Sequence, residues 1–174
     1  FIHQIVSLMG LPLLSVKGVE ADDVIGTLVQ QATNKHLDVL ISTQDKDLAQ
    51  LVSPTVTLLN TMTDTFLDEK GVVKKFGVRA DQIKDYLALV GDASDNIPGV
   101  PKCGPKTAVK WLDEFKSLEN LITNSEKIKG KIGENLRESL AFLPTSYDLV
   151  TIRKNVELDT TLEALVAKPI EAEK

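Results

Sequence analysis

The sequence has few of the features that mark several large classes of protein. Its single cysteine, Cys103, excludes an internal disulfide framework and fits a reducing compartment. No apolar run approaches the length of a membrane span. The chain opens at Phe1 without a Met or a basic-then-apolar leader, so we expect no signal peptide and an excerpt of a longer protein. With ordinary glycine and proline contents and 43% hydrophobic residues, the 174-residue chain can bury a core.

The chain also lacks an overall positive charge, since its net charge is −5. The charge is unevenly distributed: residues 1–97 carry eight Lys/Arg against thirteen Asp/Glu, whereas residues 98–154 carry ten against seven. An acidic part that collects cations, followed by a basic part that contacts phosphates, would reconcile the sign with a polyanionic partner. On charge alone, however, an excess of this size is better explained as a solvated surface.

Hydrophobic periodicity predicts an α/β arrangement in the first half of the chain. It predicts one helix ending at Gly10 and a second from Glu20 to about Lys35. Short apolar runs predict buried strands at Leu11–Val16, Asp38–Thr43 and Val56–Asn60, and an edge strand at Thr63–Leu67. With a short helix over Lys46–Val52, this order predicts parallel pairing with right-handed crossovers, and ligands then gather at the carboxyl ends of the strands.

From Asp68 onwards the pattern becomes helical. The predicted helices cover Glu69–Phe76, Ala80–Val90, Pro105–Phe115, Leu118–Thr123, Ile132–Leu143 and Ser146–Val150. Thr151–Leu158 is predicted to leave this part as an extended segment. We therefore expect an α/β core over residues 1–79, a helical module over residues 80–160, and a linker or tail over residues 161–174.

Three clusters of acidic residues follow the ends of predicted strands or helices. They are Glu20, Asp22 and Asp23; Asp45 and Asp47; and Asp92 and Asp95. The first two clusters follow predicted strand ends, and the third pair would share a cation if it lies on one helical turn. Carboxylates without a His or Cys cluster favour Mg²⁺ or Mn²⁺ over Zn²⁺. Two such ions about 4 Å apart would clamp the attacking and leaving oxygens in phosphodiester cleavage.

Each cluster also has a simpler interpretation. Taken singly, Glu20, Asp22 and Asp23 are better explained as helix caps and dipole partners. Asp45 and Asp47 alone would be a cap and a surface charge, and the third pair would be an Asx turn. Three clusters at equivalent corners weaken these interpretations and favour a shared metal site.

A glycine- and lysine-rich turn follows the third cluster. It spans Gly99–Ala108 and is predicted to enter a helix at Thr107, which would leave backbone N–H groups free beside Lys106. This arrangement suits a phosphate backbone, and the alternative is a plain helix-hairpin-helix packing element. The residues predicted to contact such a backbone are Gly99, Lys102, Gly104, Lys106 and Thr107.

These motifs make the chain resemble a known family. The segments Gly18–Gly26, Asp45–Asp47 and Gly91–Pro101 closely resemble the 5′→3′ exonuclease domain of bacterial DNA polymerase I, one of the structure-specific 5′ nucleases or flap endonucleases. The likeness covers about residues 1–160. It implies a PIN-like parallel-sheet core followed by a helix-three-turn-helix (helix-hairpin-helix) module. It also implies that the turn Gly99–Ala108 holds duplex DNA, with K⁺ bound by its main-chain carbonyls.

The resemblance assigns metal ligands residue by residue. It implies a first divalent ion at Glu20, Asp22 and Asp23, and a second mainly at Asp45, Asp47, Asp92 and Asp95. Two local departures stand out: Gln44 replaces a usual glycine, and Lys102 lies where the family commonly has Gly in its hairpin. The family's first strand, with another metal-binding Asp, and its basic helical arch have no counterpart in the sequence. We therefore expect an incomplete metal site in this fragment.

The resemblance implies a metal-dependent 5′→3′ exonuclease or flap endonuclease that cuts DNA near 5′ ends, flaps or nicks during replication and repair. We expect polymerase domains C-terminal to it, a monomeric state, a cytoplasmic location and no membrane partner. Two alternatives stay open. The fragment alone would be a non-catalytic duplex-DNA-binding module, or the chain would be a PIN-type ribonuclease. The hairpin, which suits duplex backbone, argues against the ribonuclease.

Overall fold

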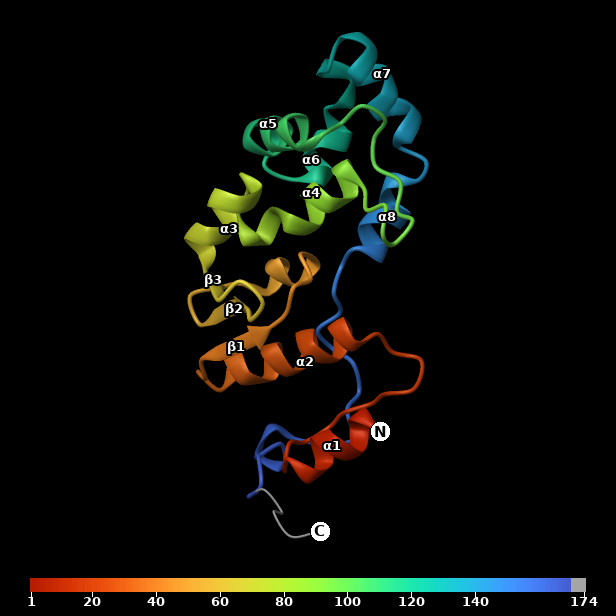
Figure 1. Ribbon diagram of the computed structural model, residues 1–174. Coiled ribbons are helices and arrows are strands. Elements are labelled where there is room, and N and C mark those ends of the chain that lie inside the picture. Colours follow the sequence, from red (N-terminus) through yellow and green to blue (C-terminus); the bar gives the residue numbers. More distant parts are fainter. Residues whose placement is uncertain (170–174) are drawn as a thin grey trace. The chain divides into compact units, whose positions relative to one another are not determined.

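The computed structural model describes residues 1–169. The chain forms two compact units: Phe1–Leu37 together with the chain from Arg153 onwards, and Asp38–Ile152. Figure 1 traces both from the N-terminus to the C-terminus. No helix within residues 1–169 is both long enough and apolar enough to cross a membrane.

The first unit consists of two helices and irregular segments. Helix α1 (Ile2–Leu8) ends before Gly10, whose φ of +72° suits glycine, and helix α2 (Ala21–Asn34) buries Val24, Val29 and Ala32. The predicted strand at Leu11–Val16 is wrong, because this segment is irregular. Two features account for this: Pro12 lacks a backbone N–H, and Leu11 and Leu13 are exposed rather than buried.

The return segment runs along α2 within the same unit. Arg153 N–H donates to Asp23 Oδ1 at 2.8 Å, and Val156 N–H donates to Thr27 Oγ1 at 3.0 Å. A single 3₁₀ turn, η4 (Leu162–Ala164), follows. The predicted linker or tail over residues 161–174 lies partly outside the described residues, which end at 169.

A three-stranded sheet begins the second unit. Strands β1 (Val39–Ser42) and β2 (Val56–Asn60) are parallel, as predicted, with Val39 opposite Val56. Strand β3 (Thr65–Leu67) pairs antiparallel with β2 and confirms the predicted edge strand, so the sheet is mixed with the order β1-β2-β3. The connection from β1 to β2 contains η1 (Asp47–Leu51), a 3₁₀ helix that buries Leu48 and Leu51.

The rest of the second unit is helical, as predicted. Its elements are α3 (Glu69–Phe76), η2 (Ala80–Gln82), α4 (Ile83–Val90), α5 (Pro105–Phe115), α6 (Leu118–Thr123), η3 (Ser125–Lys127), α7 (Gly130–Ser139) and α8 (Leu143–Leu149). The predicted helix Ile132–Leu143 runs too far, since α7 ends at Ser139. Pro144 lacks an N–H for a continuing helix and instead lies in the first turn of α8.

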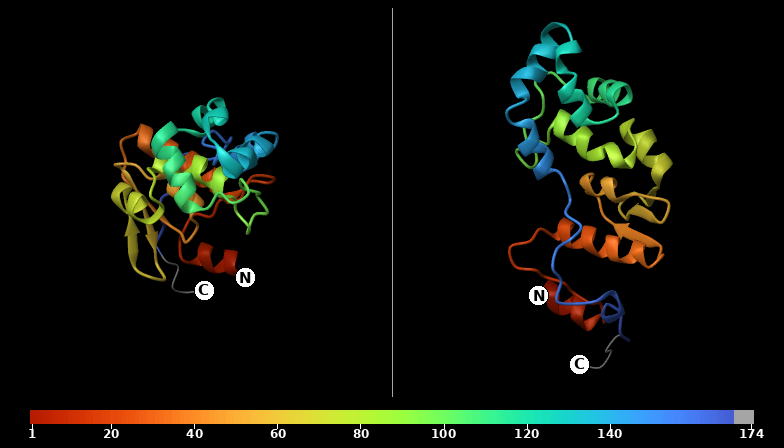
Figure 2. Two further views of the ribbon diagram at one scale, coloured as in Figure 1. Left: turned by 90° about the horizontal axis from the view of Figure 1, so that it is seen from above. Right: turned by 180° about the vertical axis from the view of Figure 1, so that it is seen from behind.

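Helix α4 is the centre of this unit. It packs against η1 on one side and against α5 and α8 on the other, and Figure 2 shows α5, α6 and α7 on the far side of α4 from the sheet. Its side chains Ile83, Leu87 and Leu89 are at most 2% exposed. Burial on this scale contributes roughly 1.5–3 kcal/mol per side chain. The end of α4 is therefore held firmly between the sheet and the helices.

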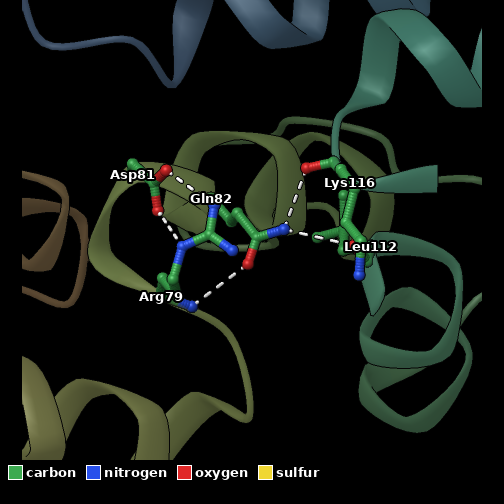
Figure 3. Close-up of polar contacts among 5 residues, drawn as sticks. All are labelled: Arg79, Asp81, Gln82, Leu112 and Lys116. Atoms are coloured by element: carbon green, nitrogen blue, oxygen red, sulfur yellow. Dashed lines mark hydrogen bonds and ion pairs between the residues drawn. The ribbon is translucent and has the colours of Figure 1, made fainter. Parts of the chain in front are cut away.

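A buried amide also ties the start of α4 to the end of α5 (Figure 3). Gln82 Nε2 donates to the carbonyl oxygens of Leu112 at 3.2 Å and Lys116 at 2.9 Å, while its Oε1 accepts from Arg79 N–H. Leu112 O also accepts from Lys116 N–H, so Gln82 adds a second hydrogen bond there and a further one to Lys116 O just past the end of α5. Asp81 holds Arg79 by two hydrogen bonds on the exposed side. The two helices that flank the loop and hairpin are thereby fixed to each other.

Candidate metal centre

The loop after α4 is closed by its own backbone. Asp92 N–H donates to Ile97 O at 2.9 Å, and Ile97 N–H donates back to Asp92 O at 2.8 Å. Two residues permit this tight path: Gly91 has a φ of +81° and Asn96 a φ of +55°. Asp92 and Asp95 therefore lie in a loop and not on a helical turn, which corrects that expectation.

Three carboxylates from two separate segments meet at this loop. One oxygen each of Asp47, Asp92 and Asp95 lies within 4.8 Å of the others. Asp47 begins η1 just past the carboxyl end of β1, so the expected position at a strand end is confirmed for this residue. The structure brings together three of the seven predicted ligands, and their role as ligands stays a prediction.

The chemistry of this cluster fits a hard divalent cation. The donors are all carboxylate oxygens, which Mg²⁺ and Mn²⁺ prefer. Asp47 Oδ1 is buried and has no hydrogen-bond partner within the described residues. A buried acceptor left in this state costs about 1–3 kcal/mol, and a bound cation would remove that cost.

Asp92 is the most buried member of the cluster, at 4% exposed, and both of its oxygens have partners. Oδ2 is 2.6 Å from Lys46 Nζ, and Oδ1 accepts from the backbone N–H and the hydroxyl of Ser94. Burial by itself would raise the pKa of Asp92, but the hydrogen bonds and charge from Lys46 and Ser94 lower it to about 2. Asp92 is thus ionised at every physiological pH, and it also forms the Asx turn of the simpler interpretation.

Asp47 has the opposite electrostatic environment. Burial is the main cause that raises its pKa to about 7, and the negative charges of Asp45, Asp92 and Asp95 add to it, whereas Lys46 opposes the shift. An unfolded chain ionises this carboxyl near pH 4. The contribution of Asp47 to stability therefore falls as the pH rises from about 4 to about 7.

We expect the affinity for Mn²⁺ to increase roughly tenfold between about pH 6 and about pH 8, because Asp47 must lose its proton to bind a cation. Isothermal titration calorimetry in two buffers of different ionisation enthalpy measures both the affinity and the proton released. An Asp47→Asn variant is the control, since it should bind weakly at both pH values. A wild-type affinity that does not change with pH would contradict the expectation.

The other four predicted metal ligands lie at or near the starts of helices. Asp45 Oδ1 accepts the N–H of Asp47 at 2.9 Å in an Asx turn just before η1. Glu20, Asp22 and Asp23 belong to the first unit, where Glu20 is the exposed N-cap residue of α2 and the other two lie in its first turn. Asp23 also accepts from Arg153 N–H. Their assignment to a first metal ion stays a prediction.

Sequence reasoning missed two side chains of this site. Lys46 lies between Asp45 and Asp47, and Ser94 between Asp92 and Asp95, but the pattern of acidic residues gives neither of them a role. Both contact Asp92 directly. A lysine between two proposed carboxylate ligands is itself a signal, because a cation there must affect the charge of the cluster.

The hairpin that follows is anchored by buried polar side chains. Asn135 Nδ2 donates to Pro101 O at 2.7 Å, and the Ser146 hydroxyl donates to Pro98 O at 3.1 Å. Asn135 and Ser146 are at most 4% exposed, and they reach the hairpin from α7 and α8. Cys103 is buried, and burial raises its pKa to about 12, so it is an unreactive packing residue.

The first turn of the helix after the hairpin uses some of the backbone N–H groups that were expected to be free for a phosphate. Helix α5 starts at Pro105, and the N–H groups of Thr107 and Ala108 both donate to Gly104 O. The N–H groups of Thr107 and Ala108 are thus used within the helix, and the role of Thr107 in binding phosphate stays a prediction. The side chains of Lys102 and Lys106 are exposed, and nothing lies within 4 Å of the space that a Cβ on Gly104 would fill. This surface offers positive charge and room for close approach.

Lys102 has a φ of +66°, a left-handed conformation that costs a residue with a Cβ about 1–2 kcal/mol. We expect Lys102→Gly to stabilise the fold by about 0.5–1 kcal/mol and to weaken DNA binding with a salt slope reduced by about one. Thermal unfolding and fluorescence anisotropy at several salt concentrations measure these effects. Lys102→Asn separates them, because asparagine removes the charge but tolerates this conformation. Destabilisation by Lys102→Gly would contradict the strain, and an unchanged slope would contradict the DNA contact.

Two family models match consecutive parts of the chain. The model described as "5′-3′ exonuclease, N-terminal resolvase-like domain" matches residues 1–77, and "5′-3′ exonuclease, C-terminal SAM fold" matches residues 78–173. The chain belongs to the 5′-3′ exonuclease family. The predicted fold class, an α/β core followed by a helical module, and the predicted family are both confirmed.

Curated relatives of this 5′-3′ exonuclease family member are longer than the chain. DNA polymerase I of Pseudomonas aeruginosa is 47% identical over 176 residues, which cover 94% of the chain and 19% of that protein. The 5′-3′ exonuclease of Aquifex aeolicus is 42% identical over 167 residues, covering 96% of the chain and 57% of that protein. The chain thus spans between a fifth and three fifths of these relatives.

Solved structures of nucleases share the fold. A T5 5′-exonuclease with bound zinc ions is 26% identical with a TM-score of 0.75, covering 80% of this chain and 52% of that one. A bacteriophage T5 flap endonuclease in complex with DNA and metal ions is 25% identical with a TM-score of 0.74, covering 79% and 51%. The catalytic core of Rad2 with DNA substrate, at 20% identity and a TM-score of 0.62, covers 98% and 59% and supports the fold alone.

Proposed function

We propose that the complete protein to which this chain belongs hydrolyses DNA phosphodiesters near 5′ ends, flaps or nicks with the help of divalent metal ions. The observation that carries the proposal is the convergence of Asp47, Asp92 and Asp95, with a buried Asp47 oxygen that accepts no hydrogen bond from residues 1–169. Membership of the 5′-3′ exonuclease family supports the reaction class. The T5 relative with both DNA and metal ions supports the substrate.

The proposed cofactors are two ions of Mg²⁺ or Mn²⁺. Asp47, Asp92 and Asp95 would hold one ion with the help of Asp45, and Glu20, Asp22 and Asp23 would contribute to the other. Such ions supply a bound water acidic enough to act as the nucleophile and neutralise charge on the phosphate. The chain's own contribution is to keep Asp92 ionised and fixed by Ser94, and to direct Asp47 towards the same point.

The proposed DNA contact is the hairpin before α5. Lys102 and Lys106 provide exposed positive charge, Gly104 and the half-buried Thr107 leave space for the sugar-phosphate backbone, and Gly99 shapes the turn. The contacts would be to phosphates and hence independent of sequence. A K⁺ ion held by main-chain carbonyls of the hairpin is part of the same proposal.

In the proposed arrangement, residues 1–79 provide the nuclease core, residues 80–160 the helix-three-turn-helix DNA-binding module, and residues 161–174 a linker. Polymerase domains would follow C-terminally, as the relative from Pseudomonas aeruginosa suggests by its name and length. The protein would act as a cytoplasmic monomer in replication and repair.

Cleavage of a labelled 5′-flap DNA tests the proposal directly. We expect a version extended at the N-terminus to cut the flap when Mg²⁺ or Mn²⁺ is added and to stop when EDTA removes the ion. The 174-residue chain is assayed beside it. Cutting by the extended version alone would show that the acidic residues of this chain are part of a larger site. Binding by both without cutting would contradict the nuclease and favour the DNA-binding module, and preference for single-stranded RNA would favour the ribonuclease.

A further inference from the structure

Lys46 forms an ion pair with Asp92, the most buried carboxylate of the proposed metal site. Its Nζ lies 2.6 Å from Asp92 Oδ2, while Ser94 donates two hydrogen bonds to Oδ1. Both oxygens of Asp92 thus have partners in this structure. The neighbouring acceptor Asp47 Oδ1, in contrast, has no partner among the described residues. Within the described residues, Asp47 therefore has a carboxylate oxygen that accepts no hydrogen bond, whereas both oxygens of Asp92 have partners.

We propose that Lys46 is a built-in substitute cation, which neutralises Asp92 in the metal-free protein and leaves it when a divalent ion binds the cluster. The inference rests on the proposed metal-dependent function and goes beyond it, since it gives Lys46 a role in setting metal affinity. Lys46 would be a positioning residue: it holds the Asp92 side chain in place before the ion arrives and competes with the ion afterwards.

The pair differs from an ordinary surface salt bridge in its burial. The Asp92 side chain is 4% exposed and that of Lys46 39% exposed, so the lysine reaches from the surface into a buried carboxylate. The partners come from distant segments, the end of the β1–η1 connection and the loop after α4. Removing one partner of such a pair leaves a buried charge uncompensated, which costs far more than breaking an exposed pair.

Competition follows from the geometry of the charges. The positive charge of Lys46 acts on Asp92, Asp47 and Asp95, all three members of the cluster. A divalent ion placed among the same oxygens would meet a like charge nearby and would need the oxygen that Lys46 now holds. A divalent ion binds three carboxylates more strongly than one ammonium binds a single carboxylate, so the lysine gives way.

Replacement of Lys46 by methionine, which is unbranched and uncharged and only one atom shorter, tests the proposal. We expect Lys46→Met to bind Mn²⁺ roughly tenfold more tightly in calorimetry, because a competing like charge is gone. The metal-free variant should also melt at a lower temperature, and saturating Mn²⁺ should restore more of its stability than it adds to the wild type. Lys70→Met, an exposed lysine on α3, is the matched control and should change neither property.

The outcomes separate this proposal from the proposed function. If the wild type binds Mn²⁺ and Lys46→Met binds it equally or more weakly, the role of Lys46 is overturned while the metal site stands. If neither the wild type nor Lys46→Met binds Mn²⁺, both the metal site and the substitute cation are overturned.

A second measurement needs no variant and so does not depend on the folding of one. Lysine acetylation by a water-soluble succinimidyl ester is followed by peptide mass spectrometry on the wild-type chain with and without Mn²⁺. An amine that is ion-paired with a buried carboxylate stays protonated and reacts slowly, so we expect Lys46 to react several-fold faster once Mn²⁺ is bound. Lys70 should react at one rate in both conditions. An unchanged rate for Lys46 at saturating Mn²⁺ would overturn the proposal.

Discussion

Replacing Asp92 by asparagine in the full-length enzyme is expected to lower flap cleavage about a thousandfold, the scale of removing a group that stabilises developing charge. The change preserves size and leaves an oxygen to accept from Ser94, but it removes the negative charge that Lys46 now neutralises. Since the loop lies at the end of α4 and away from the exposed lysines of the hairpin in sequence, affinity for the flap should change little. Single-turnover cleavage and anisotropy in Ca²⁺ measure the two effects separately.

Asp113→Asn provides the matched control for this prediction. Asp113 lies on α5, its side chain is 88% exposed, and among residues 1–169 its ion pair is with Lys116 on the surface. We expect cleavage and stability close to those of the wild type. If Asp92→Asn cuts normally, or loses binding and cleavage to the same extent, Asp92 is not a metal ligand.

Replacing Gly99 by alanine is expected to destabilise the chain by about 3 kcal/mol. A Cβ at Gly99 would lie 2.3 Å from the carbonyl carbon and oxygen of Val90 and 2.5 Å from the nitrogen of Gly91. These are backbone atoms of the end of α4, which a rotamer change cannot move. Chemical denaturation should show the loss, together with a melting temperature lower by roughly 10 °C.

Gly104→Ala tests the same hairpin at a position with open space. Nothing lies within 4 Å of the Cβ that it would add, and its φ of −87° suits any residue. We expect a change in stability within about 0.5 kcal/mol but weaker DNA binding, because the new methyl group fills the space proposed for a phosphate. Equal stability of the two variants would contradict the packing of Gly99 against α4.

Several helix boundaries could be predicted from the sequence because local signals define them. Helix α3 begins after Asp68, whose side chain accepts from Gly71 N–H, and ends before Gly77 at a φ of +77°. Ser117 similarly caps α6 by accepting from Asn120 N–H. Such contacts join residues only a few positions apart, so they are visible in the sequence.

The incorrect predictions concern segments whose structure depends on contacts with distant parts of the chain. The apolar run Leu11–Val16 suggested a strand, but a strand needs a partner, and none pairs with it within residues 1–169. The spacing of Asp92 and Asp95 suggested a helical turn, whereas Gly91 ends α4 just before them. The motif suggested that Asp47 and Asp92 act together, but only the fold shows that Lys46 bridges to Asp92.

The most direct test of the central claim is to map the metal site by iron-mediated cleavage of the polypeptide. Fe²⁺ replaces the divalent ion in the full-length protein, ascorbate and peroxide generate radicals at the bound iron, and mass spectrometry locates the backbone cuts. The account predicts cuts at residues 45–47 and 92–95 that Mn²⁺ suppresses and that Asp92→Asn abolishes. Cuts at residues 20–23 as well would place the first acidic cluster at the same centre. Cleavage elsewhere, or cleavage that Mn²⁺ does not suppress, would contradict a metal centre at Asp47, Asp92 and Asp95.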